Sequence, residues 1–238
     1  MTTAPPDPHD PGLDNPVWAS LTSTHAHLAE VSGRAARFPV DVSPFAGAAD
    51  LGDPAGWAGL AALAGPSASV VLPGLTVAPP AGWTTRSLIP GVQMVAPESF
   101  GVSAPGDGPP VRELGEDDVP EMLDLVRRTR PGPFATRTRL LGTYLGIREE
   151  GRLVAMAGER LRPPGATEIS AVCTDESVRG RGYASHLLRA VAAGVRARGE
   201  TPFLHAAGEN VSAIRLYAAL GFRHRRDITF ALLQTPPA

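Results

Sequence analysis

The chain contains no lysine, because all 22 of its basic residues are arginine. Without lysine no side chain can form a Schiff base with pyridoxal phosphate, and no Walker-type lysine can bind a nucleotide phosphate. An arginine-only basic set is typical of a GC-rich genome, and we expect a bacterial source. Two classes of cofactor and nucleotide chemistry are therefore excluded before any motif is considered.

Cysteine is almost absent too, with Cys173 as its single copy, so no disulfide can form within the chain. A lone thiol suits a reducing compartment, and we expect a cytoplasmic protein. No apolar run approaches the roughly 18 residues that a membrane-spanning helix needs. The polar, proline-rich start of the chain resembles neither a signal peptide nor an anchor. We therefore expect no membrane partner.

An excess of positive charge is also lacking, since 22 basic and 24 acidic residues give a formal net charge of −2. Proteins that bind nucleic acid need a basic surface to neutralise phosphates, so we expect no nucleic-acid partner. Asp7, His9 and Asp10 lie among prolines, and His25 and His27 are two residues apart, the wrong offset for one helical face. We therefore expect no metal site.

What the chain does have is enough apolar sequence for a core and a clear point of division. Its 238 residues are 43% hydrophobic, which allows one large domain or two small ones. The stretch GVSAPGDGPP, residues 101–110, contains three glycines and three prolines and cannot continue a helix or a central strand. We predict a loose tail, an N-terminal α/β domain, a linker and a second domain at 1–14, 15–100, 101–110 and 111–238.

The first of these domains carries ordinary structural patterns and no candidate chemistry. Apolar spacing predicts helices over Val17–Val31 and Trp57–Leu63, and SVVLPG and GVQMVA are typical of strands. The second domain alternates strands and helices more regularly. Its predicted order is the strand PVRELG, a helix from Asp117 or Asp118 to about Thr129, a short helix in FATRTRLLG, a hairpin turning at Glu150-Gly151, the strand TEISAVCT, a helix to about Arg198, the strand TPFLHAA, the helix NVSAIRLYAALGF and the strand RRDITFALL.

A glycine-arginine turn opens the long helix, in the stretch SVRGRGYASHLL at residues 177–188. The first amides of a helix lack internal partners, and glycine lets a ligand approach the backbone closely, so such a turn can bind phosphate. A turn that needs glycine only for its own geometry is an equally good interpretation of this segment alone. Ser185 stands where a Rossmann fingerprint needs its third glycine, and a P-loop needs lysine.

Two motifs together give a family resemblance. RGRGYA at 179–184 matches the pattern [QR]-x-x-G-x-[GA], and NVSAIRLYAALGF is similar to the late motif in which asparagine opens a helix ending in LY..LGF. In this order they resemble the GNAT superfamily of N-acetyltransferases over residues 111–238. The resemblance implies an α/β (α+β) fold with a mixed, mostly antiparallel central sheet flanked by helices. The smaller N-terminal domain is then a reduced, GNAT-like half.

The resemblance also implies a cofactor, acetyl-CoA, and the residues that bind it. The backbone from Gly180 to Ala184 would hold the pyrophosphate of coenzyme A. The strand before the turn would pair with the pantetheine arm, and the asparagine that opens the late helix would touch that arm or simply cap the helix. The full cofactor set is Val172, Cys173, Thr174, Arg179, Gly180, Arg181, Gly182, Tyr183, Ala184 and Asn210.

Acetyl transfer to an amine needs a proton acceptor for the nitrogen and a proton donor for the leaving thiolate. Tyr217 matches the family's tyrosine acid, although it could instead pack in the core. For the base we favour Glu168, with Glu159 as the competitor, and among apolar neighbours either carboxylate would have a raised pKa. Each glutamate could instead form a salt bridge with an arginine. Cys173 is expected to be inert packing.

We therefore predict an acetyl-CoA-dependent N-acetyltransferase that acts by direct attack of a primary amine. The alternative is a catalytically inactive module that binds acyl-CoA as a sensor or interaction domain. A nucleotide-binding protein using the same turn is a third candidate. The expected partner is a small-molecule or peptide amine acceptor, and homodimer formation is left open.

Overall fold

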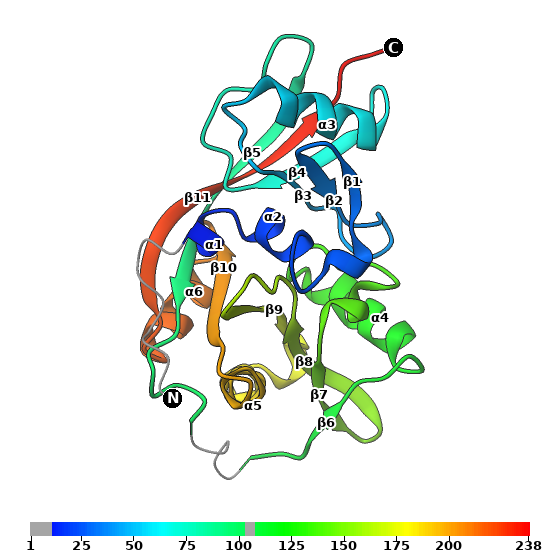
Figure 1. Cartoon of the computed structure of the whole chain (residues 1–238). Helices are drawn as coiled ribbons and strands as arrows, with labels where there is room; N and C mark the ends of the chain where they lie inside the picture. The colour runs from blue at the N-terminus through cyan, green and yellow to red at the C-terminus, as the bar shows by residue number, and fades with distance from the viewer. Residues whose placement is uncertain (1–10, 103–107) are drawn as a thin grey trace.

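The computed structural model of the chain describes residues 11–102 and 108–238, and these contain two β-sheets (Figure 1). The small sheet joins β1 (Glu30–Ser32), β2 (Ala35–Arg37) and β3 (Ala46–Ala48). The large sheet has the order β4-β11-β5-β10-β9-β8-β7-β6. Its strands are β4 (Ser69–Pro73), β5 (Thr84–Val95), β6 (Val111–Glu113), β7 (Tyr144–Glu149), β8 (Arg152–Glu159), β9 (Ala166–Thr174), β10 (Thr201–Ala207) and β11 (Arg223–Gln234).

Six α-helices and three short 3₁₀ turns connect these strands in the described part of the chain. They are α1 (Pro11–Asp14), α2 (Pro16–Leu21), η1 (Ala26–Leu28), α3 (Pro54–Ala64), α4 (Val119–Thr129), η2 (Thr138–Leu141), η3 (Glu176–Val178), α5 (Tyr183–Ala197) and α6 (Val211–Ala219). All pairs in the large sheet are antiparallel except β9 with β10. The predicted mixed, mostly antiparallel sheet flanked by helices is confirmed.

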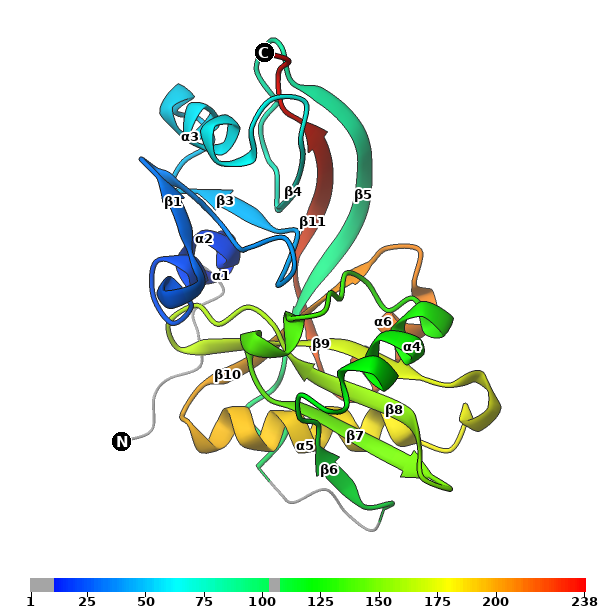
Figure 2. The same ribbon diagram turned by 90° about the vertical axis from the view of Figure 1, so that its right-hand side faces the viewer.

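The large sheet crosses the predicted domain boundary. β5 belongs to the first part of the sequence, yet it lies between β10 and β11 and pairs with both. In Figure 2, β5 and β11 run side by side from the lower half of the molecule into the upper half, where α3 and the small sheet lie. The division into two domains stays a prediction, and residues 103–107 of the predicted linker lie outside the described residues.

The start of the described chain is packed against this sheet. Residues 11–14, assigned from sequence to a loose tail, instead form α1, with Leu13 buried. The Leu13 carbonyl accepts a hydrogen bond from Gln93 Nε2 at 2.8 Å, and Asp14 binds Arg225 and Arg226. Asp7, His9 and Asp10 lie outside the described residues.

Helices cover both faces of the sheet beside β8 and β9, because successive strand side chains point to opposite faces. Ala155 and Ala157 pack with the buried side of α5, whereas Met156 between them packs with α4. The buried side of α5 is the one that its apolar spacing predicts: Leu187, Leu188, Val191 and Val195. Figure 2 shows α5 and α4 on either side of these strands.

Two predicted helices differ from the structure. The helical spacing from Val17 to Val31 is wrong beyond Leu21, because α2 ends there and β1 begins at Glu30. At this end the Thr22 and Ser23 hydroxyls donate to helix carbonyls, a local interaction that competes with regular structure. The FATRTRLLG segment forms only the 3₁₀ turn η2.

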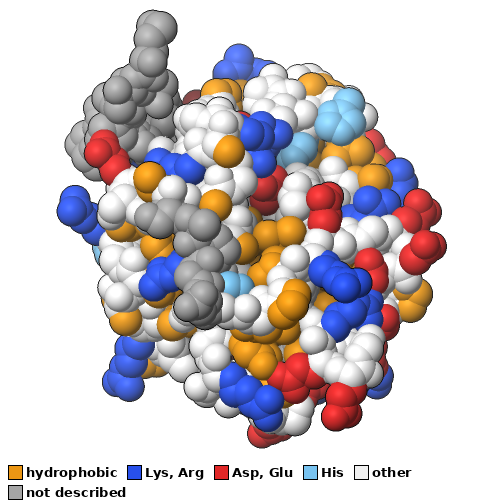
Figure 3. All heavy atoms as spheres, turned by 90° about the horizontal axis from the view of Figure 1, so that it is seen from below, with side chains coloured by type: hydrophobic (Ala, Val, Ile, Leu, Met, Phe, Trp, Pro, Cys, Tyr) orange, Lys and Arg blue, Asp and Glu red, His pale blue; other side chains and the backbone are white. Residues whose placement is uncertain are grey.

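Seen from below, arginines and carboxylates are interspersed around a central group of hydrophobic side chains (Figure 3). This mixture of signs agrees with the small net charge. Within residues 11–102 and 108–238, no helix combines the length and the apolar character needed to cross a bilayer.

Candidate active site

A groove of about 720 Å³ opens beside the end of β9. It brings together three segments predicted from the sequence to bind the cofactor or act in catalysis, namely the end of β9, the glycine turn and α6 with its N-cap. Its lining is Thr129, Arg130, Pro131, Val172, Cys173, Thr174, Val178, Arg179, Gly180, Gly182, Tyr183, Ala184, Ser185, Asn210, Ser212, Ala213, Leu216 and Tyr217.

The groove exists because β9 and β10 diverge. The two strands are in register over only three residue pairs, which end at Glu168 and Phe203. Beyond that point β9 is also bent by a bulge, where Ala171 has a positive φ of 52° and the register with β8 shifts. The rest of β9, which includes Val172, Cys173 and Thr174, therefore has one edge without a registered neighbour strand among the described residues.

Side chains from both faces of the sheet reach this groove. Thr129 to Pro131 end α4, which packs on one face, whereas Tyr217 belongs to the core cluster of α5 on the other face. A lining drawn from both faces means that the groove passes through the gap between β9 and β10. A ligand held on the α5 side can therefore meet a second ligand that enters from the α4 side.

The glycine turn presents to the groove backbone amides that have no hydrogen-bond acceptor within residues 11–102 and 108–238. Gly180 and Gly182 have φ values of 81° and 78°, a conformation that glycine adopts without strain. Gly182 is the N-cap of α5, and among the described residues no side-chain cap hydrogen bond is made there. The first amides of α5 are therefore available to an anion, and the helix dipole adds to their attraction.

The two arginines of the turn have different surroundings. Arg179 lines the groove, and no ion pair of its guanidinium occurs among the described residues. Arg181 does not line the groove but pairs with Glu149 on β7 at 3.0 Å, and the Tyr183 hydroxyl donates to the same carboxylate. Arg179 is therefore the turn arginine with a guanidinium left for a ligand.

Four predicted cofactor-binding residues of the strand and late helix also line the groove. The Thr174 hydroxyl oxygen is buried and has no hydrogen-bond partner within the described residues. Burial raises the pKa of the Cys173 thiol to about 11, so this thiol stays protonated and poorly nucleophilic at neutral pH. Asn210 caps α6 by accepting from the Ala213 amide at 3.2 Å, as one of its two predicted roles required, and its contact with a pantetheine arm stays a prediction.

Tyr217 reaches the groove from the middle of α6, although it is only 7% exposed. Burial raises the pKa of its phenol to about 12, with a further contribution from Cys173. The hydroxyl therefore keeps its proton at neutral pH and can donate it to a developing anion.

Glu168 has surroundings that differ from the prediction. It does not line the groove and is fully buried. Arg160 binds it through two hydrogen bonds, Nε–Oε2 at 2.9 Å and Nη2–Oε1 at 2.5 Å, and His205 Nδ1 lies 2.7 Å from Oε1. Burial opposes ionisation, but Arg160 and His205 outweigh it and lower the pKa of Glu168 to about 2. The predicted rise in this pKa is wrong, and a role in proton transfer stays a prediction.

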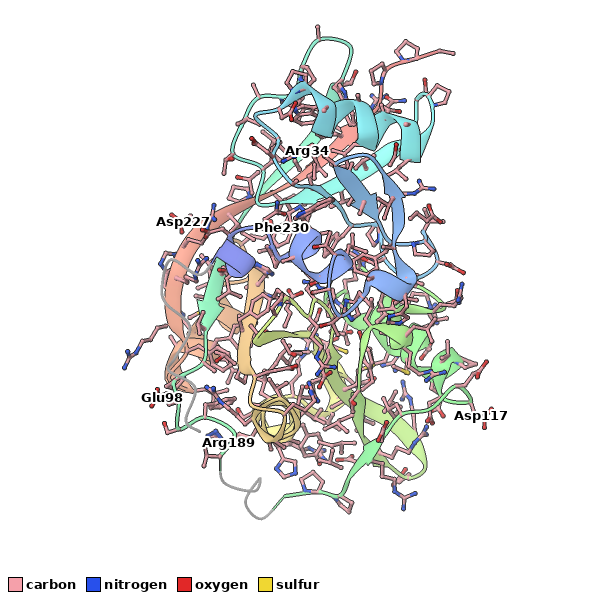
Figure 4. The ribbon with its side chains drawn as sticks, viewed as in Figure 1. Arg34, Glu98, Asp117, Arg189, Asp227 and Phe230 are labelled. Atoms are coloured by element: carbon pink, nitrogen blue, oxygen red, sulfur yellow. The ribbon has the colours of Figure 1, made fainter. Side chains whose placement is uncertain are left out.

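This ion pair is one end of a buried polar network that crosses the sheet. Gln93 Oε1 accepts from Arg225 Nη1 at 2.7 Å, which turns the Gln93 Nε2 toward His205 Nε2 at 3.0 Å. His205 Nε2 is then the acceptor, and its Nδ1 donates to Glu168. Phe230, labelled on β11 in Figure 4, packs edge-on against His205 with ring centroids 6.0 Å apart.

The competing glutamate is also held in an ion pair. Glu159, 3% exposed on β8, binds Arg198 with an N–O distance of 2.9 Å and does not line the groove. A salt bridge with an arginine is the alternative expected from the sequence for each glutamate, and both glutamates form one. Among the described residues that line the groove there is no aspartate or glutamate.

The sequence analysis missed the contribution of Thr129, Arg130 and Pro131. The predicted helix end at Thr129 was correct, and the signal was the proline at 131, because the residue before a proline rarely continues a helix. What the sequence did not show is that this helix end faces the same groove as the glycine turn.

The comparisons with known proteins agree with this geometry. The model of the FR47-like protein family matches residues 144–231. A GNAT-family protein assigned as an acetyltransferase, from Novosphingobium aromaticivorans DSM 12444, is 46% identical with a TM-score of 0.84, over 94% of this chain and 98% of that one. A GCN5-related N-acetyltransferase from Kribbella flavida shares the fold at 20% identity and a TM-score of 0.63, over 95% and 97% of the two chains. No curated protein matches the sequence.

An identity of 46% over nearly the whole of both chains shows that this chain belongs to the GNAT superfamily of N-acetyltransferases. The family resemblance predicted from RGRGYA and the late helix is confirmed. Acetyl transfer is the general activity of this family, and its acceptors are generally amines.

Proposed function

We propose that the protein is an acetyl-CoA-dependent N-acetyltransferase that acetylates a primary amine by direct attack. The observation that carries the proposal is the single groove lined by the end of β9, the glycine turn and α6. The end of β9 and the glycine turn adjoin in sequence, whereas α6 follows only after β10, and each is a segment that the resemblance assigns to the cofactor.

The residues present fit the cofactor. The uncapped amides at Gly182 and the start of α5, with Arg179 beside them, suit a diphosphate. The unpaired edge of β9 at 172–174 suits the amide groups of a pantetheine arm, which could pair as an added strand does. Bound acetyl-CoA supplies the acetyl group as a thioester, an activated acyl donor.

Tyr217 is the proposed proton donor to the departing sulfur. Its high pKa means that the phenol is fully protonated at working pH, and its place in the groove lining puts it beside the end of β9. For the amine proton we propose removal through water, because no carboxylate among the described residues lines the groove.

We also propose that the first part of the chain helps to build the acceptor side. The segment after α4 leads from Arg130 to η2 and is held by residues 41 and 42. The Arg137 amide donates to the Asp41 carbonyl at 2.8 Å, and the Thr138 hydroxyl donates to the Val42 carbonyl at 2.6 Å. These bonds fix the loop that begins at the groove. We also propose that the enzyme is cytoplasmic.

The test measures release of CoA thiol from acetyl-CoA across a panel of amines, with mass spectrometry of the products. Tyr217→Phe is expected to lower kcat by about 100-fold, because a general acid contributes roughly 10²- to 10⁴-fold. Tyr144→Phe is the matched control, since the buried Tyr144 hydroxyl has no hydrogen-bond partner in the described part of the chain and the residue does not line the groove.

Two outcomes would contradict the proposal. Tight CoA binding without thiol release for any amine would favour the inactive acyl-CoA-binding module. Stronger thermal stabilisation by ATP or NAD than by CoA would favour a nucleotide-binding protein, because at equal concentration the ligand that binds more tightly stabilises the fold more.

A further inference from the structure

Arg130 occupies an unusual position at the end of α4. Its φ of 50° is in the left-handed region, which residues other than glycine seldom adopt, and Pro131 follows it directly. Helices commonly end on such a residue, but the usual choice is glycine because a side chain there adds strain. Ending the helix does not by itself explain why a long charged side chain stands at this position.

The neighbouring arginines show what Arg130 lacks. Arg127 and Arg128 both bind Asp124, and Arg128 also binds Asp175. No ion pair or side-chain hydrogen bond of Arg130 occurs among the described residues, and its one recorded hydrogen bond is from its backbone amide to Val126. Arg130 is exposed and helps to line the groove. Its guanidinium is therefore accessible to a ligand at the groove and has no anionic partner among the described residues.

The position of Arg130 separates it from the proposed phosphate site. The phosphate-binding amides belong to the start of α5, which packs on one face of the sheet, whereas α4 packs on the other face. Arg130 therefore stands on the face from which a second substrate can enter the gap between β9 and β10. No carboxylate of the described lining is present to neutralise it.

We propose that Arg130 binds an anionic group, a carboxylate in the first place, on the amine acceptor, so that the enzyme prefers amino acids or similar amino-carboxylates to plain amines. This inference rests on the proposed function. A guanidinium binds a carboxylate through two parallel hydrogen bonds, which fixes both the position and the orientation of the acceptor. The phosphates of the cofactor are the other possible anion, and the experiment separates the two sources.

The first measurement needs no turnover. In ¹⁵N-labelled protein saturated with CoA, the Nε–Hε resonance of Arg130 is assigned by its loss in Arg130→Lys. We expect it to shift when N-acetyl amino acids are added and to stay in place when the matching N-acetyl amino acid amides are added. A shift caused by CoA alone with none on adding the acids, or no shift in either step, would overturn the inference.

The second measurement compares acceptor pairs that differ only in the carboxylate, such as phenylalanine with phenethylamine. For Arg130→Gln we expect the acceptor KM to rise roughly 10- to 100-fold for the acids, as expected for loss of a charge-assisted hydrogen bond, and to stay within about twofold for the amines. The KM of Arg130→Lys for the acids should fall between the values for the wild type and for Arg130→Gln. The KM for acetyl-CoA should not change in either variant. Arg127→Gln, an exposed arginine three residues earlier, is the matched control.

A third variant separates a purely structural role. Arg130→Gly removes the guanidinium and the left-handed strain together, so we expect a higher Tm with the same loss of preference for acids. A higher Tm with unchanged KM and kcat for both the acids and the plain amines would show that Arg130 only ends the helix. If no amine is turned over, the proposed function fails, and the resonance of Arg130 still decides whether it binds carboxylates.

Discussion

Replacing Glu168 with glutamine tests whether this residue is a base or a structural anion. Its partner Arg160 is 8% exposed and lies over the Phe45 ring at 4.8 Å, so in the variant a buried guanidinium keeps no carboxylate partner among the described residues. Removing one partner of a buried ion pair costs about 3–5 kcal/mol. The pKa of Glu168, lowered from 4.5 to about 2, corresponds to roughly 3 kcal/mol at pH 7. The destabilisation expected from breaking the ion pair and the free energy expected from the pKa shift therefore agree.

Thermal and urea unfolding measure this effect. A chain of this length loses roughly 2–4 °C in Tm per kcal/mol, so Glu168→Gln should unfold about 6–20 °C below the wild type at pH 7. Because the folded pKa lies below the unfolded one, the stabilisation is present above pH 4.5 and is lost as pH falls toward about 2. The variant should lack that acid transition. Replacing both Arg160 and Glu168 with methionine should recover most of the stability.

Kinetics at a temperature where the variant is folded then decides the predicted catalytic role. If Glu168 is structural, kcat of Glu168→Gln should stay within a few-fold of the wild type. A loss of 10²-fold or more in a folded variant would show that Glu168 acts in proton transfer. An unfolding free energy within about 1 kcal/mol of the wild type at pH 7 would refute the ion-pair reasoning itself.

Three further predictions follow from the described structure. His25 is buried, and burial lowers its pKa to about 4, so the wild type should lose roughly 3 kcal/mol between pH 6.5 and pH 4, and His25→Gln should flatten this part of a stability–pH curve. Gly182→Ala should lower both Tm and CoA affinity. Gly199 has a similar φ of 75° but lies outside the groove, so Gly199→Ala should lower Tm alone. Equal CoA affinities of the two variants would contradict the role of the glycine turn. A fragment starting at residue 108 should fail to fold, because it lacks β5 between β10 and β11, and a native-like circular dichroism melt of that fragment would contradict this.

Local signals made much of the second half predictable from sequence. The hairpin at Glu150-Gly151, the asparagine cap of α6 and the end of α5 at about Arg198 depend on neighbours within a few residues, and each lies where the sequence predicts it. Much of the groove lining was predictable because the end of β9, the glycine turn and the start of α5 are consecutive in the chain.

The rest depends on contacts between distant residues. Gln93 meets His205, 112 positions away, only after β5 has entered the sheet beside β10, and nothing local to either residue indicates that pairing. The pKa of Glu168 was wrongly predicted for the same reason, because Arg160 and His205 come beside it only through the registers of β8, β9 and β10. A sequence window shows a carboxylate among apolar residues but not the cations that neutralise it.

The insertion of β5 into the large sheet limits when the protein can fold during its synthesis. β5 leaves the ribosome well before its partners, since Arg86 on β5 bonds to Gln234, 148 positions later. The nascent chain must therefore carry an unpaired, partly apolar strand until β10 and β11 have been made. Such late closure is expected to make folding slow and dependent on protection of that edge during synthesis.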